Sequence, residues 1–329
     1  MLSSIRKKHF LIAIILGVTI WLLAKNKDTK STEGKKHSKV IAITQIVEHP
    51  GLNIELAGMR SVLAAEGYTD IILQNAHGNS VTAVQIAQKL VAAHPDVIIA
   101  LSTPSAQSVL AAIGTNKIPL VFSAVTDPVA ARLIKDISIP ESYVTGVCDN
   151  LSGEAQLKFV LTLIPSLKRL GIIYNPGEAN SAAIFQQLLQ AASSLGIQLI
   201  PATPHRSSEV AAAAQSLVGR SEAIFVPNDN TASAALESIV RVGHIHKIPV
   251  LSGDPATMPK GIAAAVGYDR HRLGELAGKM AIRILLEGPN AIPVATDHSV
   301  QISLNKEAAH AMDLTLPKDL PSNIKIWRQ

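Results

Sequence analysis

The sequence predicts an α/β protein built from two similar, doubly wound parallel-sheet lobes that face each other across a central cleft. Three observations lead to this fold class. Short apolar runs rich in β-branched residues alternate with stretches of helical period, the alternation occurs twice in the same order, and polar residues follow the apolar runs in both halves. Near-continuous apolar strands separated by helices are typical of parallel strands covered on both faces.

The first half of the body alternates four expected strands with three expected helices. The strands are expected at residues 39–46, 70–76, 96–102 and 118–125. The helices are expected at residues 52–67, 81–94 and 104–114. This order indicates one doubly wound unit.

The second half repeats the pattern over residues 167–256. The segments "NKIPLVFSAVTDP" and "HKIPVLSGDPA" share Lys-Ile-Pro before the strand and Asp-Pro after it. We expect the chain to cross between lobes near residues 143–150, to return to the first lobe within residues 261–288, and to cross again within residues 298–305. The expected domains are an N-terminal segment, a first lobe and a second lobe, at residues 1–38, 39–146 plus about 268–296, and 147–267 plus about 297–329.

The N-terminal segment has the pattern of an export signal. Arg6, Lys7 and Lys8 precede an uncharged apolar run at residues 10–24, and a polar, Lys-rich stretch follows it. Leu22 stands where a small residue would favour cleavage, and no cysteine follows for a lipid attachment. We therefore expect an exported protein, periplasmic or on the outer face of the cytoplasmic membrane, with residues 10–24 as an uncleaved anchor and a flexible tether behind them.

The charge distribution argues against a nucleic-acid partner. The chain carries a formal net charge of +5, but nine of its Lys and Arg residues lie within residues 1–39. The remaining body is slightly acidic, and a nucleic-acid-binding domain needs a basic surface of its own. The chain has one cysteine, Cys148, which cannot form an internal disulfide and says nothing about the compartment.

Polar side chains gather where the expected strands end. In open α/β sheets ligands bind outside the carboxyl ends of the strands, and free N–H groups at the following helices favour an anionic group. The candidate polar ligand-binding residues are Gln45, His49, Ser102, Thr103, Ser123, Thr126, Asp127, Asn175, Glu178, Asn180, Ser181, Asp229, Asn230 and Asp254. Each of them also suits a helix cap or a turn. Their recurrence at corresponding strand ends of both halves favours a site.

No motif for catalysis or for a cofactor occurs. The sequence lacks a G-x-S-x-G elbow, a P-loop and a G-x-G-x-x-G turn, so hydrolase, NTPase and dinucleotide-binding functions have no support. His244 and His246 could offer imidazoles to a metal, but no third ligand lies near them in the sequence. An acid–base pair of His49 and Asp127 is conceivable, although no spacing places them together. We expect no enzyme activity, no metal and no cofactor.

Several segments in order resemble one known family. The segments "STPSAQ", "KIPLVFSAVTDPVAARL", "TGVCDN", "LGIIYNPGEANS", "VPNDN" and "GIAAAVGYDRHRLGELAGKMA" are similar to those of ABC-transporter substrate-binding proteins of the tryptophan/tyrosine-binding type. The resemblance extends over residues 39–317. It implies a type I periplasmic-binding-protein fold whose lobes close at a hinge around a small ligand. The missing cysteine after the signal is a departure from lipid-anchored relatives.

The resemblance also implies a ligand and partners. Members look like receptors that deliver an aromatic amino acid, such as tryptophan, phenylalanine or tyrosine, to a membrane permease driven by an ATPase. For such a zwitterion we expect the carboxylate at the helix starts of Ser102-Thr103 and Asn180-Ser181. The expected ammonium partners are Asp127 and Asp229, with Glu178 or Asp254 as further candidates. The candidates for a wall against the ring are Phe122, Tyr174, Phe225 and Tyr268, and each of them, Phe122 and Phe225 above all, also suits the core.

Two other functions stay open at this point. The same fold could report its ligand to a membrane partner as an anchored sensor, and an enzyme on a doubly wound fold is the third candidate. For the junction "YNPGEANS" (residues 174–181), we expect Glu178 and Asn180 to face Glu48 and His49 of the first lobe across the cleft.

Overall fold

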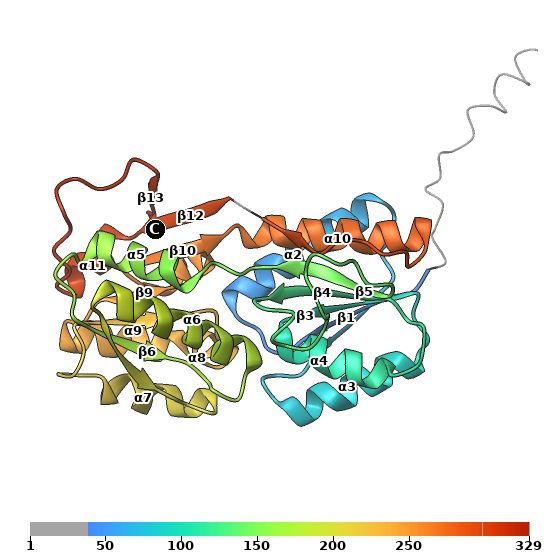
Figure 1. Ribbon diagram of the computed structural model, residues 1–329, viewed down its shortest axis with the longest axis horizontal. Helices are drawn as coiled ribbons and strands as arrows, with labels where there is room; N and C mark the ends of the chain where they lie inside the picture. Colours follow the sequence, from blue (N-terminus) through green and yellow to red (C-terminus); the bar gives the residue numbers. More distant parts are fainter. Residues whose placement is uncertain (1–38, 298, 329) are drawn as a thin grey trace, which may run out of the picture. The chain divides into compact units, whose positions relative to one another are not determined.

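The computed structural model describes residues 39–297 and 299–328, and they form two sheets (Figure 1). The expected anchor at residues 10–24 lies outside this range. Within the described residues, no helix combines the length and apolar character needed to cross a membrane.

The first sheet has six parallel strands in the order β11-β5-β4-β3-β1-β2. These strands are β1 (Ile41–Gln45), β2 (Ile71–Asn75), β3 (Val97–Leu101), β4 (Leu120–Val125), β5 (Val144–Cys148) and β11 (Ala295–Thr296). The helices that pack on it are α2 (Pro50–Ala65), α3 (Ser80–Ala92), α4 (Thr103–Ile113) and α10 (Arg270–Glu287). We call this sheet and its helices the first lobe.

The second sheet has seven strands in the order β13-β12-β10-β9-β8-β6-β7. Its strands are β6 (Arg169–Ile173), β7 (Gln198–Ala202), β8 (Ala223–Val226), β9 (Val250–Ser252), β10 (Ala264–Tyr268), β12 (Val300–Leu304) and β13 (Ile324–Ile326). Its helices are α5 (Gly153–Leu163), α6 (Ala179–Leu195), α7 (Val210–Ser216), α8 (Asn230–Ala234), α9 (Leu236–His246) and α11 (Lys306–Ala311), with 3-10 turns η1 (Ser207–Glu209) and η2 (Pro255–Lys260). We call this unit the second lobe. One pairing, β10 with β12, is antiparallel.

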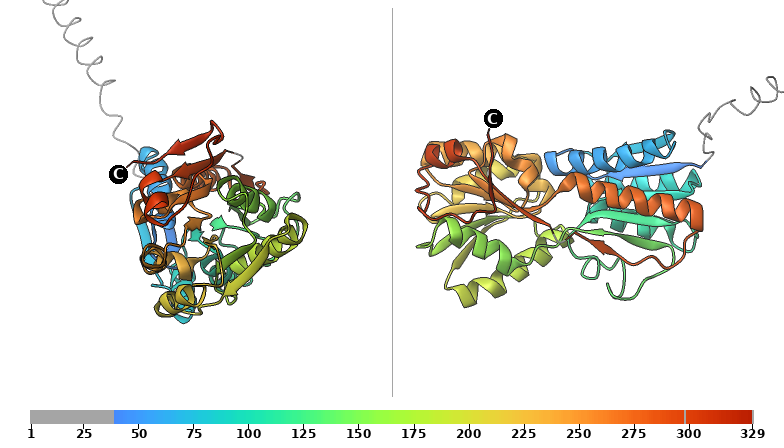
Figure 2. Two further views of the ribbon diagram at one scale, coloured as in Figure 1. Left: turned by 90° about the vertical axis from the view of Figure 1, so that its left-hand side faces the viewer. Right: turned by 90° about the horizontal axis from the view of Figure 1, so that it is seen from above.

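Each lobe is a three-layer sandwich with its own apolar core (Figures 1 and 2). The central strands β1, β3 and β8 are buried at every position, which requires helices on both faces of each sheet. In the first lobe α3 packs with α4 on one face, and α2 packs with α10 on the other. The predicted fold class, two parallel-sheet α/β lobes, is confirmed.

The chain passes three times between the lobes. It leaves β5 for α5, leaves β10 for α10, and leaves β11 for β12. The second passage matters for function, because Arg270 stands at its end as the first residue of α10.

Small residues allow α2 and α10 to pack very closely. A methyl group on Gly58 would overlap the carbonyl oxygen of His271, and one on Gly274 would overlap that of Glu55. A methyl group on Gly278 would lie 3.0 Å from the carbonyl oxygen of Met59. This glycine seam sets the distance between the helix that carries Glu55 and the helix that carries Arg270.

Replacing Gly274 by Ala should therefore destabilise the protein although alanine favours helices. The added methyl group must push α10 away from α2, and overpacking of this kind lowers the free energy of unfolding by about 1–3 kcal/mol. Urea unfolding of the full-length chain measures the change. Lys279→Ala, on the exposed face of the same helix, is the control and should stay within about 0.5 kcal/mol. Equal midpoints for the two variants would contradict the tight seam.

Candidate ligand-binding site

A polar pocket lies between the two lobes. The first lobe contributes His49, which caps α2, Leu52 of α2 and residues at the end of β4, and the second lobe contributes the starts of α6, α8 and η2. The complete lining is His49, Leu52, Ala124, Thr126, Asp149, Asn180, Asn228, Asp229, Asn230, Ser233, Asp254 and Arg270. The free space is about 20 Å³, room for little more than one water molecule. The lobes therefore meet closely here.

Arg270 is the centre of the pocket's charge network. Its Nη1 lies 2.5 Å from Asp149 Oδ2 and 3.4 Å from Glu55 Oε2, and its Nε lies 3.1 Å from Asp254 Oδ2. Its Nη2 donates to Asn228 Oδ1 at 3.1 Å. Burial alone would lower the pKa of the guanidinium, but Asp254, Asp149 and Glu55 together raise it above its usual value. One cation thus joins α2, the β5–α5 link and η2.

Asp149 connects this network to both lobes. Besides Arg270, its carboxylate accepts from Thr126 Oγ1 at 3.1 Å and from Asn228 Nδ2 at 3.2 Å. It is 3% exposed and stands in the first link between the lobes. Hydrogen bonds from three side chains hold it beside the pocket.

Glu55 is fully buried on the core-facing side of α2. It accepts a short hydrogen bond from Ser123 and shares Arg270 with the two aspartates. Burial raises the pKa of Glu55 to about 7, against the opposing effect of Arg270. A carboxyl that is hard to ionise reduces the negative charge around Arg270 in acidic solution.

His49 caps α2 and reaches the second lobe. Its Nδ1 accepts the Leu52 N–H at 3.4 Å, so the ring proton belongs on Nε2, which lies 3.4 Å from Asn230 Oδ1. Burial lowers the pKa of His49 to about 4, and the ring is neutral at physiological pH. This contact joins two predicted residues from opposite lobes.

Asp229, one of the predicted carboxylates, joins two segments of the second lobe by hydrogen bonds. Asp229 caps α8 through Ala232 N–H at 2.6 Å and also accepts from Asn175 N–H at 2.6 Å and Ser181 Oγ at 2.7 Å. Burial and the neighbouring Glu178 raise the pKa of Asp229. These bonds tie the start of α8 to the β6–α6 junction.

The junction "YNPGEANS" differs from the expectation in one respect. Asn180 lines the pocket with His49, but Glu178 turns toward α8 in its own lobe and accepts from Asn230 and from Thr231 N–H at 3.1 Å. The unpaired N–H groups that begin α8 attract the carboxylate. Glu48 bonds instead to Asn75 Nδ2 at 3.2 Å. The predicted facing of Glu178 and Glu48 does not occur in this structure.

The start of α4 has hydroxyls without partners. The side-chain oxygens of Ser102, Thr103 and Ser105 are buried and make no hydrogen bond among the described residues. Ser102 has φ +81°, and Ala124, at the end of the neighbouring strand, has φ +52°. Ser102 N–H donates to Ser123 O at 2.8 Å, which places the α4 start next to the β4 residues that line the pocket. Such strained, unsatisfied positions collect at functional sites.

The other predicted residues lie outside the pocket lining. Gln45 Nε2 donates to Asn53 Oδ1 and Val47 O, and Asp127 accepts from the N–H groups of Val129 and Ala130 in a turn. Both therefore organise loops of the first lobe.

The four aromatic candidates for a ring wall lie in different surroundings. Phe122 and Phe225 are 0% exposed inside the two sheet cores, because β4 and β8 are covered on both faces. Tyr174 stacks on Phe185 with ring centroids 4.3 Å apart, and Tyr268 Oη donates to Asn150 O at 3.1 Å.

Three highly connected residues, Glu55, Asp149 and Arg270, are missing from the candidates that the sequence offered. Asp149 directly follows β5 and could have been included as a strand-end residue, whereas Glu55 and Arg270 lie on helices. Two signals pointed to the helical pair. Glu55 shares the apolar face of its helix with Leu52, Met59 and Leu63, where an acid needs a partner. Arg270 stands at the start of a helix, where the dipole repels cations unless carboxylates compensate.

A metal site finds no support in the described part of the chain, which contains no group of three His, Cys, Asp or Glu side chains able to hold an ion. His246, one of the two histidines considered from the sequence, has Nε2 3.2 Å from Gln215 Oε1 at an exposed position.

Glu55→Gln tests the titration of the buried acid. A carboxyl with a folded pKa near 7 and an ordinary value of 4.5 is protonated in the folded state and ionised in the unfolded state between these limits. The contribution of Glu55 to the free energy of unfolding is therefore most favourable below about pH 4.5. It decreases by up to a few kcal/mol as the pH rises to about 7. The amide cannot ionise, so the variant should lose less free energy of unfolding between pH 5 and 8 than wild type. Parallel curves in pH-dependent urea unfolding would contradict this.

Comparisons with known proteins identify relatives over most of the chain. Residues 40–323 match the family described as "ABC transporter substrate binding protein". A tyrosine-binding protein of Clostridioides difficile is 35% identical over 328 residues, covering 95% of this chain and 94% of the relative. A glucose-galactose binding protein from Geobacillus stearothermophilus, 15% identical with a TM-score of 0.62, shares the fold.

Two solved relatives differ in how well their structures match this chain. A Streptococcus pneumonia domain in complex with L-Trp is 28% identical with a TM-score of 0.83, and this chain covers 99% of it. A ligand-free, open substrate-binding protein from Clostridium difficile is 33% identical, is also covered to 99%, but has a TM-score of 0.64. The less similar sequence has the more similar structure, so this chain superimposes better on the L-Trp complex than on the open, ligand-free protein.

The family is one of exported substrate-binding proteins and not of enzymes, which agrees with a polar pocket between two lobes and with the type I periplasmic-binding-protein fold. The chain therefore belongs to the ABC transporter substrate-binding protein family.

Proposed function

We propose that this protein captures an α-amino acid with an aromatic side chain between its lobes and delivers it to the permease of an ABC importer. The observation that carries the proposal is the chemical asymmetry of the cleft. Carboxylates in excess over cations line the pocket, whereas unpartnered hydroxyls and a helix N-terminus lie at the end of the neighbouring strand. A zwitterion has the two matching ends.

The ammonium group fits best beside Asp149 and Asp254. Arg270 is a single cation among Asp149, Asp254 and Glu55, so the network has negative charge to spare. The unpartnered, buried Oδ1 of Asn180 adds an acceptor in the pocket lining. Asp229 and Glu178 are less suited as primary partners, because they join the starts of α6 and α8 within the second lobe, and burial together with Glu178 raises the pKa of Asp229.

The carboxylate fits best at the start of α4. The dipole of this 11-residue helix favours an anion, no side chain caps it, and Ser102 and Thr103 supply free hydroxyls. The other candidate site for the carboxylate is the start of α6. Glu178 and Asp229 lie beside this helix start, and Ser181 Oγ already donates to Asp229. A second negative group would be repelled there.

The side chain of the ligand would pack against Leu52, Ala124 and the neutral ring of His49, which line the pocket. The free space is too small for an aromatic amino acid, so entry requires the lobes to part and the His49–Asn230 contact to break. The preference for an aromatic side chain rests on the relatives, one named as tyrosine-binding and one solved with L-Trp.

Membership of the family supports the proposed delivery to a permease and its ATPase. Attachment to the membrane through residues 10–24 remains part of the proposal, and that segment lies outside the described residues. Such an anchor would keep the receptor beside its transporter.

Calorimetric titration of the full-length protein tests the ligand class. We expect L-tyrosine, L-tryptophan or L-phenylalanine to bind in the micromolar range or tighter, and their amides, which lack the carboxylate, to bind at least about tenfold more weakly. Glucose is the negative control. An absence of binding by all three amino acids would refute the aromatic amino-acid assignment.

Ser102→Gly tests the carboxylate site separately from folding. Glycine accepts φ +81° without strain, so the variant should be as stable as wild type or more so, by roughly 0.5–1 kcal/mol. It removes a hydroxyl, so affinity for the amino acid should fall by about tenfold. Arg132→Gly relieves the same strain at an exposed residue with φ +58° outside the pocket, and its affinity should be unchanged. Equal affinities for both variants would exclude Ser102 from the site.

A further inference from the structure

A glycine at the start of α2 lies directly against a carboxylate of the opposite lobe. Gly51 is the second residue of α2 in the first lobe, and Asp254 caps η2 in the second lobe. A methyl group on Gly51 would overlap Asp254 Oδ2 and lie 3.3 Å from both Asp254 Cγ and His49 Cε1. A side chain on residue 51 would therefore require the Asp254 carboxylate, which the Ala256 N–H and Arg270 hold, or the lobe that carries it, to move.

The helix itself does not require glycine at residue 51. Gly51 is absent from the residues with positive φ, so any amino acid can adopt its backbone conformation. Alanine would stabilise an exposed helix by roughly 0.5–1 kcal/mol relative to glycine. The reason for glycine is therefore the space that Asp254 occupies.

Asp254 also complements the charge of α2. The first turn of this 16-residue helix contains no acidic residue, and its cap is the neutral His49. A carboxylate from the second lobe thus sits at the positive end of a first-lobe helix, where it is stabilised by the helix dipole. The same carboxylate binds Arg270 Nε at 3.1 Å, which couples the contact to the buried charge network.

We propose that Gly51 is a positioning residue for lobe closure: its missing side chain lets Asp254 reach the start of α2, and this contact sets how tightly the lobes close on the ligand. The effect on affinity rests on the proposed function, but the effect on closure does not. The contact forms in the lobe arrangement of this structure, which matches the L-Trp complex better than the open, ligand-free relative.

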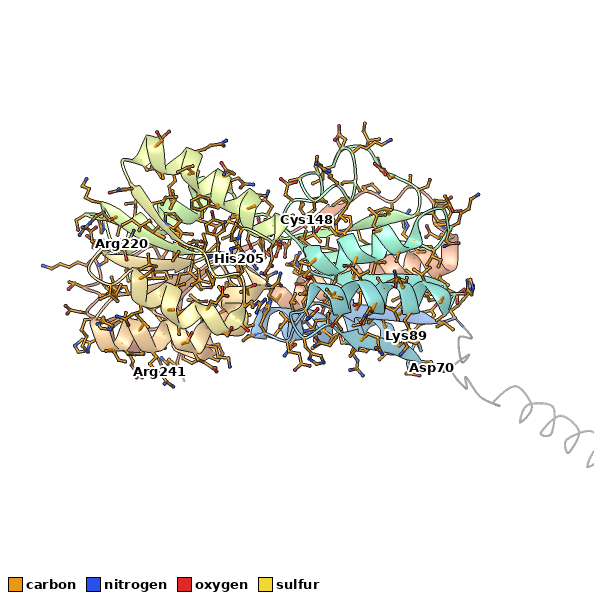
Figure 3. All side chains as sticks on the ribbon, turned by 90° about the horizontal axis from the view of Figure 1, so that it is seen from below. Asp70, Lys89, Cys148, His205, Arg220 and Arg241 are labelled. Carbon is orange, nitrogen blue, oxygen red and sulfur yellow. The ribbon has the colours of Figure 1, made fainter. Side chains whose placement is uncertain are left out.

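Spin labels on opposite lobes measure closure directly. Lys89 on α3 and Arg241 on α9 are exposed and belong to the first and second lobes, whereas the one native cysteine, Cys148, is buried (Figure 3). Full-length protein with Lys89→Cys and Arg241→Cys is labelled and examined by double electron–electron resonance, alone and with L-tyrosine or L-tryptophan. In the wild-type background, we expect the distance between the two labels to match the separation of residues 89 and 241 in this structure. After Gly51→Ala, we expect this distance to be longer.

A second substitution separates closure from general damage. Asp254→Ser keeps a capping side chain for η2 but removes the oxygen that would meet the new methyl group. Gly51→Ala should therefore lengthen the distance in the native background and leave it unchanged in the Asp254→Ser background. Thermal unfolding should show Gly51→Ala as stable as wild type.

The affinity for the ligand should depend on residue 254 in the same way as the distance between the labels. Gly51→Ala should weaken binding of L-tyrosine or L-tryptophan by about tenfold in the native background and by less than twofold in the Asp254→Ser background. An unchanged distance distribution, an equal shift in both backgrounds, or a wild-type protein that never reaches the closed distance overturns the proposal. If neither amino acid binds wild type, the proposed function fails, while the spin-label distances still decide the role of Gly51.

Discussion

The buried guanidinium of Arg270 is the interaction on which the site depends. It joins Glu55 of the first lobe, Asp149 of the link between lobes and Asp254 of the second lobe. A buried charge is tolerated only when partners of opposite charge surround it. Removing one partner destabilises the protein, because the remaining charge stays buried without compensation. The packing of the neighbouring helices places these partners around Arg270. The glycine seam brings α10 against α2, so that Arg270 and Glu55 meet at the end of a chain crossing.

The acidic residues near the cleft form two groups with different roles. Glu178 and Asp229 satisfy the first N–H groups of α8 and hold the second lobe in shape. Asp149 and Asp254 stand where the lobes meet, share one cation and leave negative charge unmatched. In the proposed function, an ammonium group of the ligand completes this second set, and the start of α4 accepts the opposite end of the ligand. The proposal thereby couples binding and closure through the same carboxylates.

Much of this was predictable from the sequence, because the alternation of apolar runs and helices places polar strand ends at one edge of each sheet. His49, Asn180, Asn230 and Asp254 were found in this way. Glu55 and Arg270 were not, because both belong to helices and meet only in the folded protein. Phe122 and Phe225, candidates for the wall or for the core, lie in the core, because strands covered on both faces bury every side chain. The commitment of Glu178 to α8 depends on hydrogen-bond geometry that no spacing reveals.

A crystal structure of the protein grown with L-tyrosine tests the account most directly. The ligand should lie between the closed lobes, with its ammonium nitrogen within hydrogen-bonding distance of Asp149 or Asp254 and its carboxylate at the N-terminus of α4 beside Ser102. A tyrosine in the reverse orientation, with its carboxylate on Arg270, would contradict the division of charge described above. So would closed lobes with the amino acid bound elsewhere.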